Sequence, residues 1–207
     1  MGSNPITVGS TMTESPVEQF EKELAQFFNA PYAVAVDSCT HGIELCLRYL
    51  KSDTVTCPAR TYISIPFTFK KLNLTWQFDD YDWAGYYYLG NTNIIDAATY
   101  WKRNGYVLGS YMCLSFQFKK HLNLVRGGAI LLENHDDYII LKKMTHDGRI
   151  PNQLWKTQDI DTVGYHYYMT IDTAMLGLKK LPEACNKKAN IWTQDDYPYL
   201  PNMTVFK

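Results

Sequence analysis

Apolar residues recur along the chain in two periods, one typical of helices and one typical of strands. Phe20, Leu24 and Phe27 repeat at helical spacing after the capping sequence Ser15–Glu18, and the helix that they predict ends before Pro31. Short apolar runs bounded by turn residues predict strands. The predicted strands cover 32–36, 54–57, 74–78, 86–89, 93–95, 106–116 and 129–132, and further helices cover 43–50, 63–71, 136–143 and 170–181.

Strands and helices alternate through the first half of the chain. This order predicts an α/β fold with a mostly parallel central sheet and helices on both of its faces. In such sheets ligands bind at the carboxyl ends of the strands. Ser38, Tyr62, Asp96 and Lys120 all follow apolar strands directly, so we expect these four side chains to share one site.

Length and composition narrow the class of protein. With 207 residues, 46% of them hydrophobic, the chain can form one good core. We expect a polar, flexible lead over 1–15, one large domain over 16–181 and a short tail over 182–207. The net charge of -1 gives no reason to expect a nucleic-acid partner, and no apolar run approaches the ~20 residues of a membrane helix. Residues 1–15 lack the regions of a signal peptide, and the five scattered cysteines suit a reducing setting, so we expect a cytoplasmic protein.

Two lysines lie in a polar loop between two apolar runs. A lysine amine can condense with a carbonyl if burial or a neighbouring cation lowers its pKa, and Lys119 supplies such a cation to Lys120. The alternative is a solvated basic turn, because lysines are mostly exposed. Spacing alone does not decide whether Lys119 or Lys120 would be the reactive residue.

The turn 37–42 joins a predicted strand to a predicted helix. Free backbone amides and the hydroxyls of Ser38 and Thr40 at a helix N-terminus can bind an anion, phosphate above all. The alternative is that these residues only cap the helix. The three aspartates of 79–85 lack the glycine and the ligand spacing of a calcium loop, so we predict a solvated turn and no metal site.

Several short motifs occur in an order that resembles the DegT/DnrJ/StrS-type sugar aminotransferases. They are Ser38-Cys39-Thr40, Cys57-Pro58-Ala59-Arg60-Thr61-Tyr62, Ile95-Asp96-Ala97-Ala98, Ser115-Phe116-x-x-x-Lys120 followed by Gly127-Gly128-Ala129, and Gly164-Tyr165-His166-Tyr167-Tyr168-Met169. The resemblance implies the large domain of a fold type I enzyme that uses pyridoxal 5'-phosphate (PLP). The chain departs from the family in length, with a shortened large domain and most of the C-terminal small domain missing.

The resemblance assigns roles to individual residues. Lys120 would form the Schiff base with PLP, and Asp96 would face the pyridine nitrogen. Tyr62 would stack on the ring, and Thr99 stands where the family usually has a Gln or His near the phenolic oxygen. The turn residues Ser38, Thr40 and His41, together with Ser115, would hold the phosphate. His166 lies where the family has an asparagine that reaches the phosphate of the neighbouring subunit, and its alternative role is aromatic packing.

The resemblance implies transfer of an amino group from an amino acid such as glutamate to a keto-sugar nucleotide. The resemblance also implies a homodimer with shared active sites. Two alternatives stay open: a PLP-dependent sugar dehydratase, and a non-catalytic relative that binds a sugar or a partner enzyme.

Overall fold

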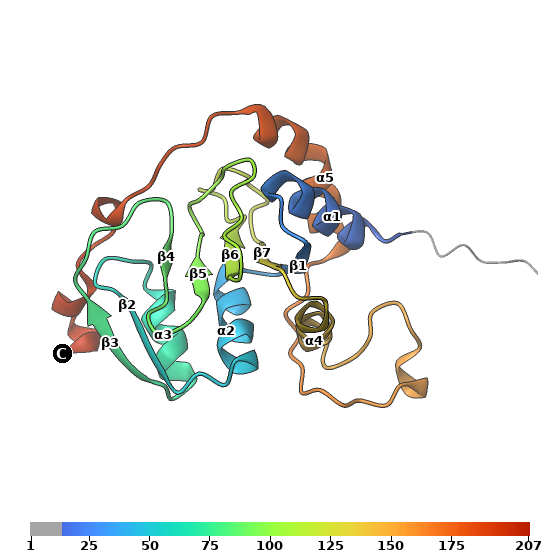
Figure 1. Cartoon of the computed structure of the whole chain (residues 1–207), viewed down its shortest axis with the longest axis horizontal. Coiled ribbons are helices and arrows are strands. Elements are labelled where there is room, and N and C mark those ends of the chain that lie inside the picture. The colour runs from blue at the N-terminus through green and yellow to red at the C-terminus, as the bar shows by residue number, and fades with distance from the viewer. Residues whose placement is uncertain (1–13) are drawn as a thin grey trace, which may run out of the picture.

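Helices and strands alternate over residues 16–79, and four further strands then follow before the last two α-helices. The computed structural model describes residues 14–207, the part of the chain drawn in colour in Figure 1. Of the predicted lead, only Glu14 and Ser15 belong to this part. The α-helices are α1 (Pro16–Phe28), α2 (Cys39–Tyr49), α3 (Ser64–Lys71), α4 (His135–Thr145) and α5 (Ile171–Asn186). The strands are β1 (Tyr32–Val36), β2 (Thr54–Pro58), β3 (Thr75–Asp79), β4 (Tyr87–Tyr88), β5 (Ile94–Asp96), β6 (Tyr111–Ser115) and β7 (Gly128–Leu132). Short 3-10 helices follow at η1 (Trp155–Thr157), η2 (Gln194–Asp196), η3 (Leu200–Asn202) and η4 (Thr204–Phe206).

The central sheet is mixed, so the prediction of a mostly parallel sheet was wrong. Its five strands lie in the order β1-β7-β6-β5-β4, while β2 and β3 form a separate parallel pair. Within the larger sheet only β5 and β6 run parallel; the pairs β1–β7, β6–β7 and β4–β5 are antiparallel.

The connections explain the antiparallel pairs. Parallel neighbours need a crossover, usually a helix, whereas a chain that folds straight back gives an antiparallel pair. The loop between β6 and β7 folds back on itself, with Phe118 N–H donating to the Val125 carbonyl and Leu124 N–H to the Phe116 carbonyl. The β4–β5 connection is a tight turn in which Leu89 N–H donates to the Ile94 carbonyl.

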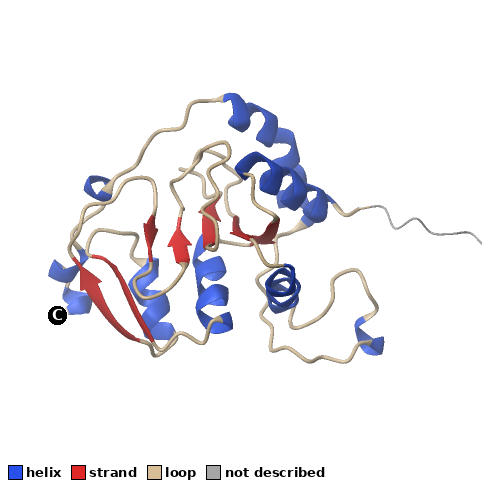
Figure 2. Ribbon diagram, viewed as in Figure 1, coloured by secondary structure: helices blue, strands red, loops and turns tan. Residues whose placement is uncertain are grey.

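Helices cover both faces of the sheet, as predicted. Alternate residues of a strand point to opposite faces. In β1, Ala33 and Ala35 therefore face a core formed with α1 and α5, whereas Val34 and Val36 face a second core formed with α2, α3 and α4. Figure 2 shows the helices on the two sides of the strands. Both faces of β1 are buried, which explains why its sequence is apolar throughout and not alternating.

The last α-helix is longer than predicted. The pattern predicts an end at Leu181, but α5 continues through Pro182 to Asn186. Its extra turn is held by tertiary contacts, because the Ala184 carbonyl accepts hydrogen bonds from the Trp101 indole at 3.1 Å and from the His121 ring at 2.8 Å. Packing here outweighs the local preference of proline to end a helix.

The segment 187–207 leaves α5 and returns across the molecule to the β2–β3 pair, where the C-terminus lies (Figure 1). Gly85 N–H donates to the Trp192 carbonyl at 2.7 Å, and Leu200 N–H donates to the Ala59 carbonyl at 2.9 Å. Leu200 is fully buried, and Phe206 packs against Phe78. This path carries the segment past the carboxyl ends of β5 and β6. None of the helices in the described chain has the length and apolar character needed to cross a membrane.

Candidate functional site

Asp96 ends β5 as a buried carboxylate that receives hydrogen bonds from neutral groups. The Tyr87 hydroxyl donates to Oδ2 at 2.5 Å, and the Ala98 N–H donates to Oδ1 at 2.9 Å. The Cys39 thiol lies 4.0 Å from Oδ1. Burial raises the pKa of Asp96, while the two hydrogen bonds and the charge of Lys120 act in the opposite direction. A buried carboxylate held by neutral donors alone is suited to a cationic partner.

Lys120 lies in the loop after β6, on the same side of the sheet as Asp96. Burial lowers the pKa of its amine, and the carboxylate of Asp96 partly offsets this effect. Lys119, one residue earlier, is exposed and lies with its amine 5.7 Å from the Phe118 ring centroid. The environment therefore separates the two lysines that the spacing left undecided: only Lys120 combines burial with a carboxylate neighbour.

Two aromatic residues of the segment 187–207 complete this side of the site. The Lys120 amine lies 4.9 Å from the centroid of the Trp192 ring. Burial raises the pKa of Tyr197, and Asp96 and Cys39 contribute to the shift, so its phenol lies within electrostatic reach of both. Neither residue could be predicted from the sequence, because the segment that carries them has no periodicity.

The start of α2 forms the second part of the candidate site. Ser38 caps the helix, and its hydroxyl accepts the His41 N–H at 3.2 Å. The Thr40 hydroxyl lies 2.8 Å from that of Ser64 in α3. The His41 ring bonds Asp37 at 2.6 Å and stacks on Tyr167, with ring centroids 3.7 Å apart. Ser38 therefore caps α2, and its predicted contact with a phosphate stays a prediction. The helix N-terminus carries the positive end of the helix dipole.

Arg126 adds a cation beside this helix start, and the sequence did not single it out. Its guanidinium donates to Asp37 Oδ2 at 2.8 Å and to the Asp37 carbonyl at 3.3 Å. The side chain stays largely exposed. An exposed arginine next to a helix N-terminus favours an anionic ligand such as phosphate.

Gly128 allows α2 to start this close to the sheet. A Cβ at this position would lie 2.5 Å from the Cys39 nitrogen and 2.8 Å from the Leu114 carbonyl oxygen. Because both contacts are with backbone, no side chain could move aside. The glycine therefore fixes the distance between the helix start and the strand that carries Ser115.

The other residues predicted for the site, apart from His166, lie around Asp96, Lys120 and the start of α2. Ser115 ends β6 opposite Gly128, and Thr99 donates to the Gly85 carbonyl at 2.9 Å. Thr99 and Lys120 both line a small cavity of about 220 Å³. Tyr62 is 59% exposed and lies close enough to Tyr197 to affect its pKa, so its ring is free to contact a ligand from outside.

His166 lies apart from the other predicted residues. It is exposed, its Nδ1 lies 3.0 Å from Asp147, and its Nε2 lies 3.0 Å from the Tyr168 hydroxyl. Its neighbour Tyr167 is the residue that contacts His41. Within one chain His166 therefore faces outward, and its predicted role toward a neighbouring subunit stays a prediction.

Comparisons with known proteins agree with the motifs. The model of the DegT/DnrJ/EryC1/StrS aminotransferase family matches residues 6–89, which confirms the resemblance that the motifs predicted. This range ends before Asp96 and Lys120, so the assignment of those two residues depends on their geometry. No protein with a curated description matches the chain.

Solved structures share the fold. AtS13 from Actinomadura melliaura has a TM-score of 0.72 at 21% identity, covering 83% of this chain and 61% of that one. Spr1654 from Streptococcus pneumoniae, described as a sugar aminotransferase in its PMP form, has a TM-score of 0.69 at 18% identity, covering 84% and 60%. DesV from S. venezuelae, solved with a ketimine intermediate, has a TM-score of 0.64 at 17% identity, covering 83% and 58%. The chain thus has the α/β fold of PLP-dependent aminotransferases and spans about three fifths of the length of these structures.

Proposed function

We propose that this chain binds PLP through Lys120 and transfers an amino group from an amino acid such as glutamate to a keto-sugar nucleotide. The observation that carries the proposal is the pair formed by Lys120 and Asp96. The amine has a lowered pKa and the buried carboxylate a raised one, and each affects the pKa of the other. Groups with shifted pKa values in one place are typical of active sites.

The residues present fit PLP at three points. A protonated pyridine nitrogen would supply the cation that buried Asp96 lacks among its hydrogen-bond donors. The start of α2, with Ser38, Thr40 and His41, and Ser115 would hold the phosphate. Arg126 would add a charge-assisted contact. Tyr62, with its exposed ring, would stack on the cofactor.

When bound, PLP supplies an electron sink for the carbon that gains or loses the amino group. The protein's own contribution is to hold and move protons. Lys120, whose pKa is lowered by burial, would take up the proton as a base and return it afterwards. Asp96 would keep a positive charge on the pyridine ring, and the hydrogen bond from Tyr87 holds Asp96 in place.

The cavity beside Lys120 offers a place for the acceptor. Lys119, Lys187 and Lys188 line it together with Trp192, and none of the carboxylates of residues 14–207 does. Lysines suit the phosphates of a sugar nucleotide, and an aromatic face suits its base. The family resemblance adds a homodimer in which the outward-facing His166 would reach the phosphate of the second subunit.

Trapping of the cofactor tests the proposal. The purified protein is mixed with PLP, reduced with borohydride and digested, and the modified peptide is identified by mass spectrometry. We expect the adduct on Lys120, its loss in Lys120→Ala and its retention in Lys119→Ala. Adducts spread over surface lysines, unchanged by Lys120→Ala, would overturn the proposal.

Glutamate then distinguishes transamination from its alternatives. An aminotransferase releases 2-oxoglutarate and retains pyridoxamine phosphate, with one of each formed per site. A dehydratase or a binding protein would retain PLP unchanged. Retention of PLP on Lys120 after glutamate addition would leave cofactor binding correct and overturn the aminotransferase assignment.

A further inference from the structure

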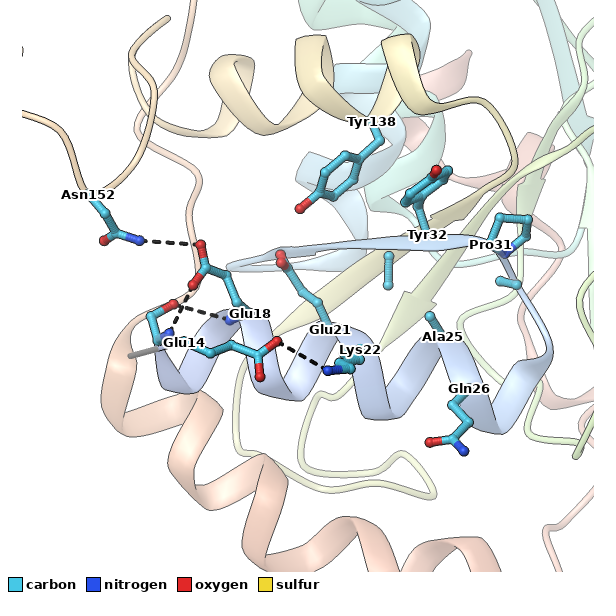
Figure 3. A pocket seen from close by; sticks show the side chains of 13 residues that line it. Glu14, Glu18, Glu21, Lys22, Ala25, Gln26, Pro31, Tyr32, Tyr138 and Asn152 are labelled. Atoms are coloured by element: carbon cyan, nitrogen blue, oxygen red, sulfur yellow. Dashed lines mark hydrogen bonds and ion pairs between the residues drawn. The ribbon is translucent and has the colours of Figure 1, made fainter. Parts of the chain in front are cut away.

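A cavity of about 1030 Å³ lies far from Lys120, between α1, the first residues of β1, and α4. Figure 3 shows Glu21 pointing from α1 into the space below Tyr138, with Tyr32 on the same side. The rings of Tyr32 and Tyr138 stack with centroids 5.1 Å apart and form an aromatic wall. The site at the carboxyl ends of β5 and β6 uses none of these residues.

Glu21 is the exceptional group in this cavity. Its side chain is almost fully buried, at 4% exposure. Oε1 accepts the Ala35 N–H at 2.6 Å and pairs with the Lys142 amine. Oε2 is the one buried side-chain nitrogen or oxygen within residues 14–207 that has no hydrogen-bond partner. A buried carboxylate oxygen without a hydrogen-bond donor destabilises the fold, so a missing partner is to be expected there.

The charges around the cavity select the kind of partner. Three carboxylates line it, those of Glu14, Glu18 and Glu21, against one lysine, Lys22. Lys22 lies 3.8 Å from Glu14, and Lys142 behind the cavity neutralises one further charge. Glu18 is engaged in the cap of α1 and accepts from Asn152 at 3.3 Å. One negative charge is left unbalanced, and the oxygen free to accept a hydrogen bond belongs to Glu21.

We infer that this cavity binds a small organic monocation, an ammonium group on an apolar body, whose N–H donates to Glu21 Oε2. The Tyr32 and Tyr138 rings would contact the apolar body, and aromatic faces also attract ammonium groups. A neutral molecule of the same shape would leave the excess negative charge of the cavity unbalanced. An anion would meet three carboxylates.

Benzylamine, which is an ammonium ion at neutral pH, is a suitable probe, and benzyl alcohol is its neutral match. The measurement is isothermal titration calorimetry on the full chain. We expect saturable 1:1 binding of benzylamine with Kd on the order of 1 mM, as for a fragment-sized ligand, and binding of benzyl alcohol at least about 10-fold weaker. Equal binding of the two probes, or no binding of benzylamine, would overturn the inference.

Variants on α1 assign the binding to Glu21. Glu21→Gln keeps the shape and removes the charge, and we expect about 10-fold weaker binding of benzylamine, equivalent to about 1.4 kcal/mol. Glu23→Gln makes the same change on the same helix outside the cavity, where Glu23 accepts from Gln19, and should bind as the unmodified chain does. If Glu21→Gln does not fold, the exposed change Lys22→Gln replaces it. Removal of that cation should tighten the binding of benzylamine, and weaker binding would count against the inference.

Discussion

The Trp192 ring lies over the amine of Lys120, with Nζ 4.9 Å from the ring centroid. The contact joins a residue of the C-terminal segment to the loop after β6. It brings an indole next to the atom that we propose to carry PLP. We therefore predict that PLP binding quenches the fluorescence of Trp192 more than that of any other of the five tryptophans.

Single Trp→Phe variants test this relationship. Trp192→Phe should remove the largest part of the quenching that PLP causes, whereas Trp155→Phe, which changes an exposed indole in η1, should leave it unchanged. The measurement is a fluorescence titration with PLP at constant protein concentration. Quenching that survives in Trp192→Phe and disappears with another tryptophan would place the cofactor elsewhere.

The lowered pKa of Lys120 predicts how its reaction with PLP depends on pH. The neutral amine is the reactive form, so the rate rises with pH and levels off above the pKa of the amine. Because burial lowers that pKa, the rate should level off at a lower pH than for a free lysine side chain. Stopped-flow absorbance over a pH series measures the midpoint, with Nα-acetyl-lysine amide as reference.

We predict that the substitution Asp96→Asn lowers the pKa of the Lys120 amine further. The carboxylate of Asp96 favours the charged form of Lys120, so its removal should lower the pKa of the amine again. The midpoint of the pH series should therefore move to lower pH. A midpoint that moves up, or does not move, would show that the two side chains do not interact in solution.

Gly128→Ala should destabilise the fold and disturb the start of α2. The added Cβ would lie 2.5 Å from the Cys39 nitrogen, so either the helix or the strand must move. We expect a loss of about 1–3 kcal/mol, the usual cost of overpacking, from the midpoint of urea unfolding. Gly109→Ala is the control for PLP binding, because within residues 14–207 no atom apart from its chain neighbours lies within 4 Å of its added Cβ. Gly109 has a φ of 73°, so this control costs about 1–2 kcal/mol through backbone strain alone and leaves PLP binding unchanged.

Much of the fold could be predicted from the sequence because its elements have strong local signals. The capping box of Ser15 and Glu18 forms as expected, and Pro31 lies just beyond the end of α1. The direction of the strands had no such local signal. Whether β6 and β7 run parallel depends on how the loop between them folds, and that loop contains neither a helix pattern nor a tight-turn sequence. The continuation of α5 past Pro182 likewise depends on contacts with Trp101 and His121, which are distant in sequence.

The candidate site was predictable where its residues follow strands and was missed where distant segments complete it. Asp96 and Lys120 follow the paired strands β5 and β6, so they lie on the same side of the sheet. The predicted α/β fold implies this arrangement. Tyr87 reaches Asp96 from β4, and Trp192 and Tyr197 arrive from the C-terminal segment. Arg126 is drawn to the start of α2 by its ion pair with Asp37, 89 positions away along the chain. No periodicity or spacing in the sequence marks any of these four side chains.

Because of the partly buried His146 ring, we predict that the folded chain loses stability as the pH falls. The ring stacks on Tyr168, and its Nδ1 lies 2.6 Å from the Thr145 hydroxyl and 3.2 Å from the Lys142 carbonyl. The pKa of His146 is lowered to about 4, mainly by burial and next by the charge of Lys142. Arg149 lowers this pKa further and Asp147 raises it, both by smaller amounts. In the unfolded chain the pKa of a histidine is near 6.5. Between these two values the unfolded chain binds a proton that the folded chain does not, so stability falls as the pH falls.

Urea unfolding at a series of pH values from 7 to 4.5 tests this sign. The contribution of one proton to the slope is at most about 1.4 kcal/mol per pH unit. His146→Asn should reduce the slope, because the group that binds the proton on unfolding is gone. His135→Asn, which changes an exposed histidine, should leave the slope unchanged. If the two variants show the same slope as the unmodified chain, protonation of His146 does not limit stability in acid, and the carboxylates paired in the folded state account for the loss.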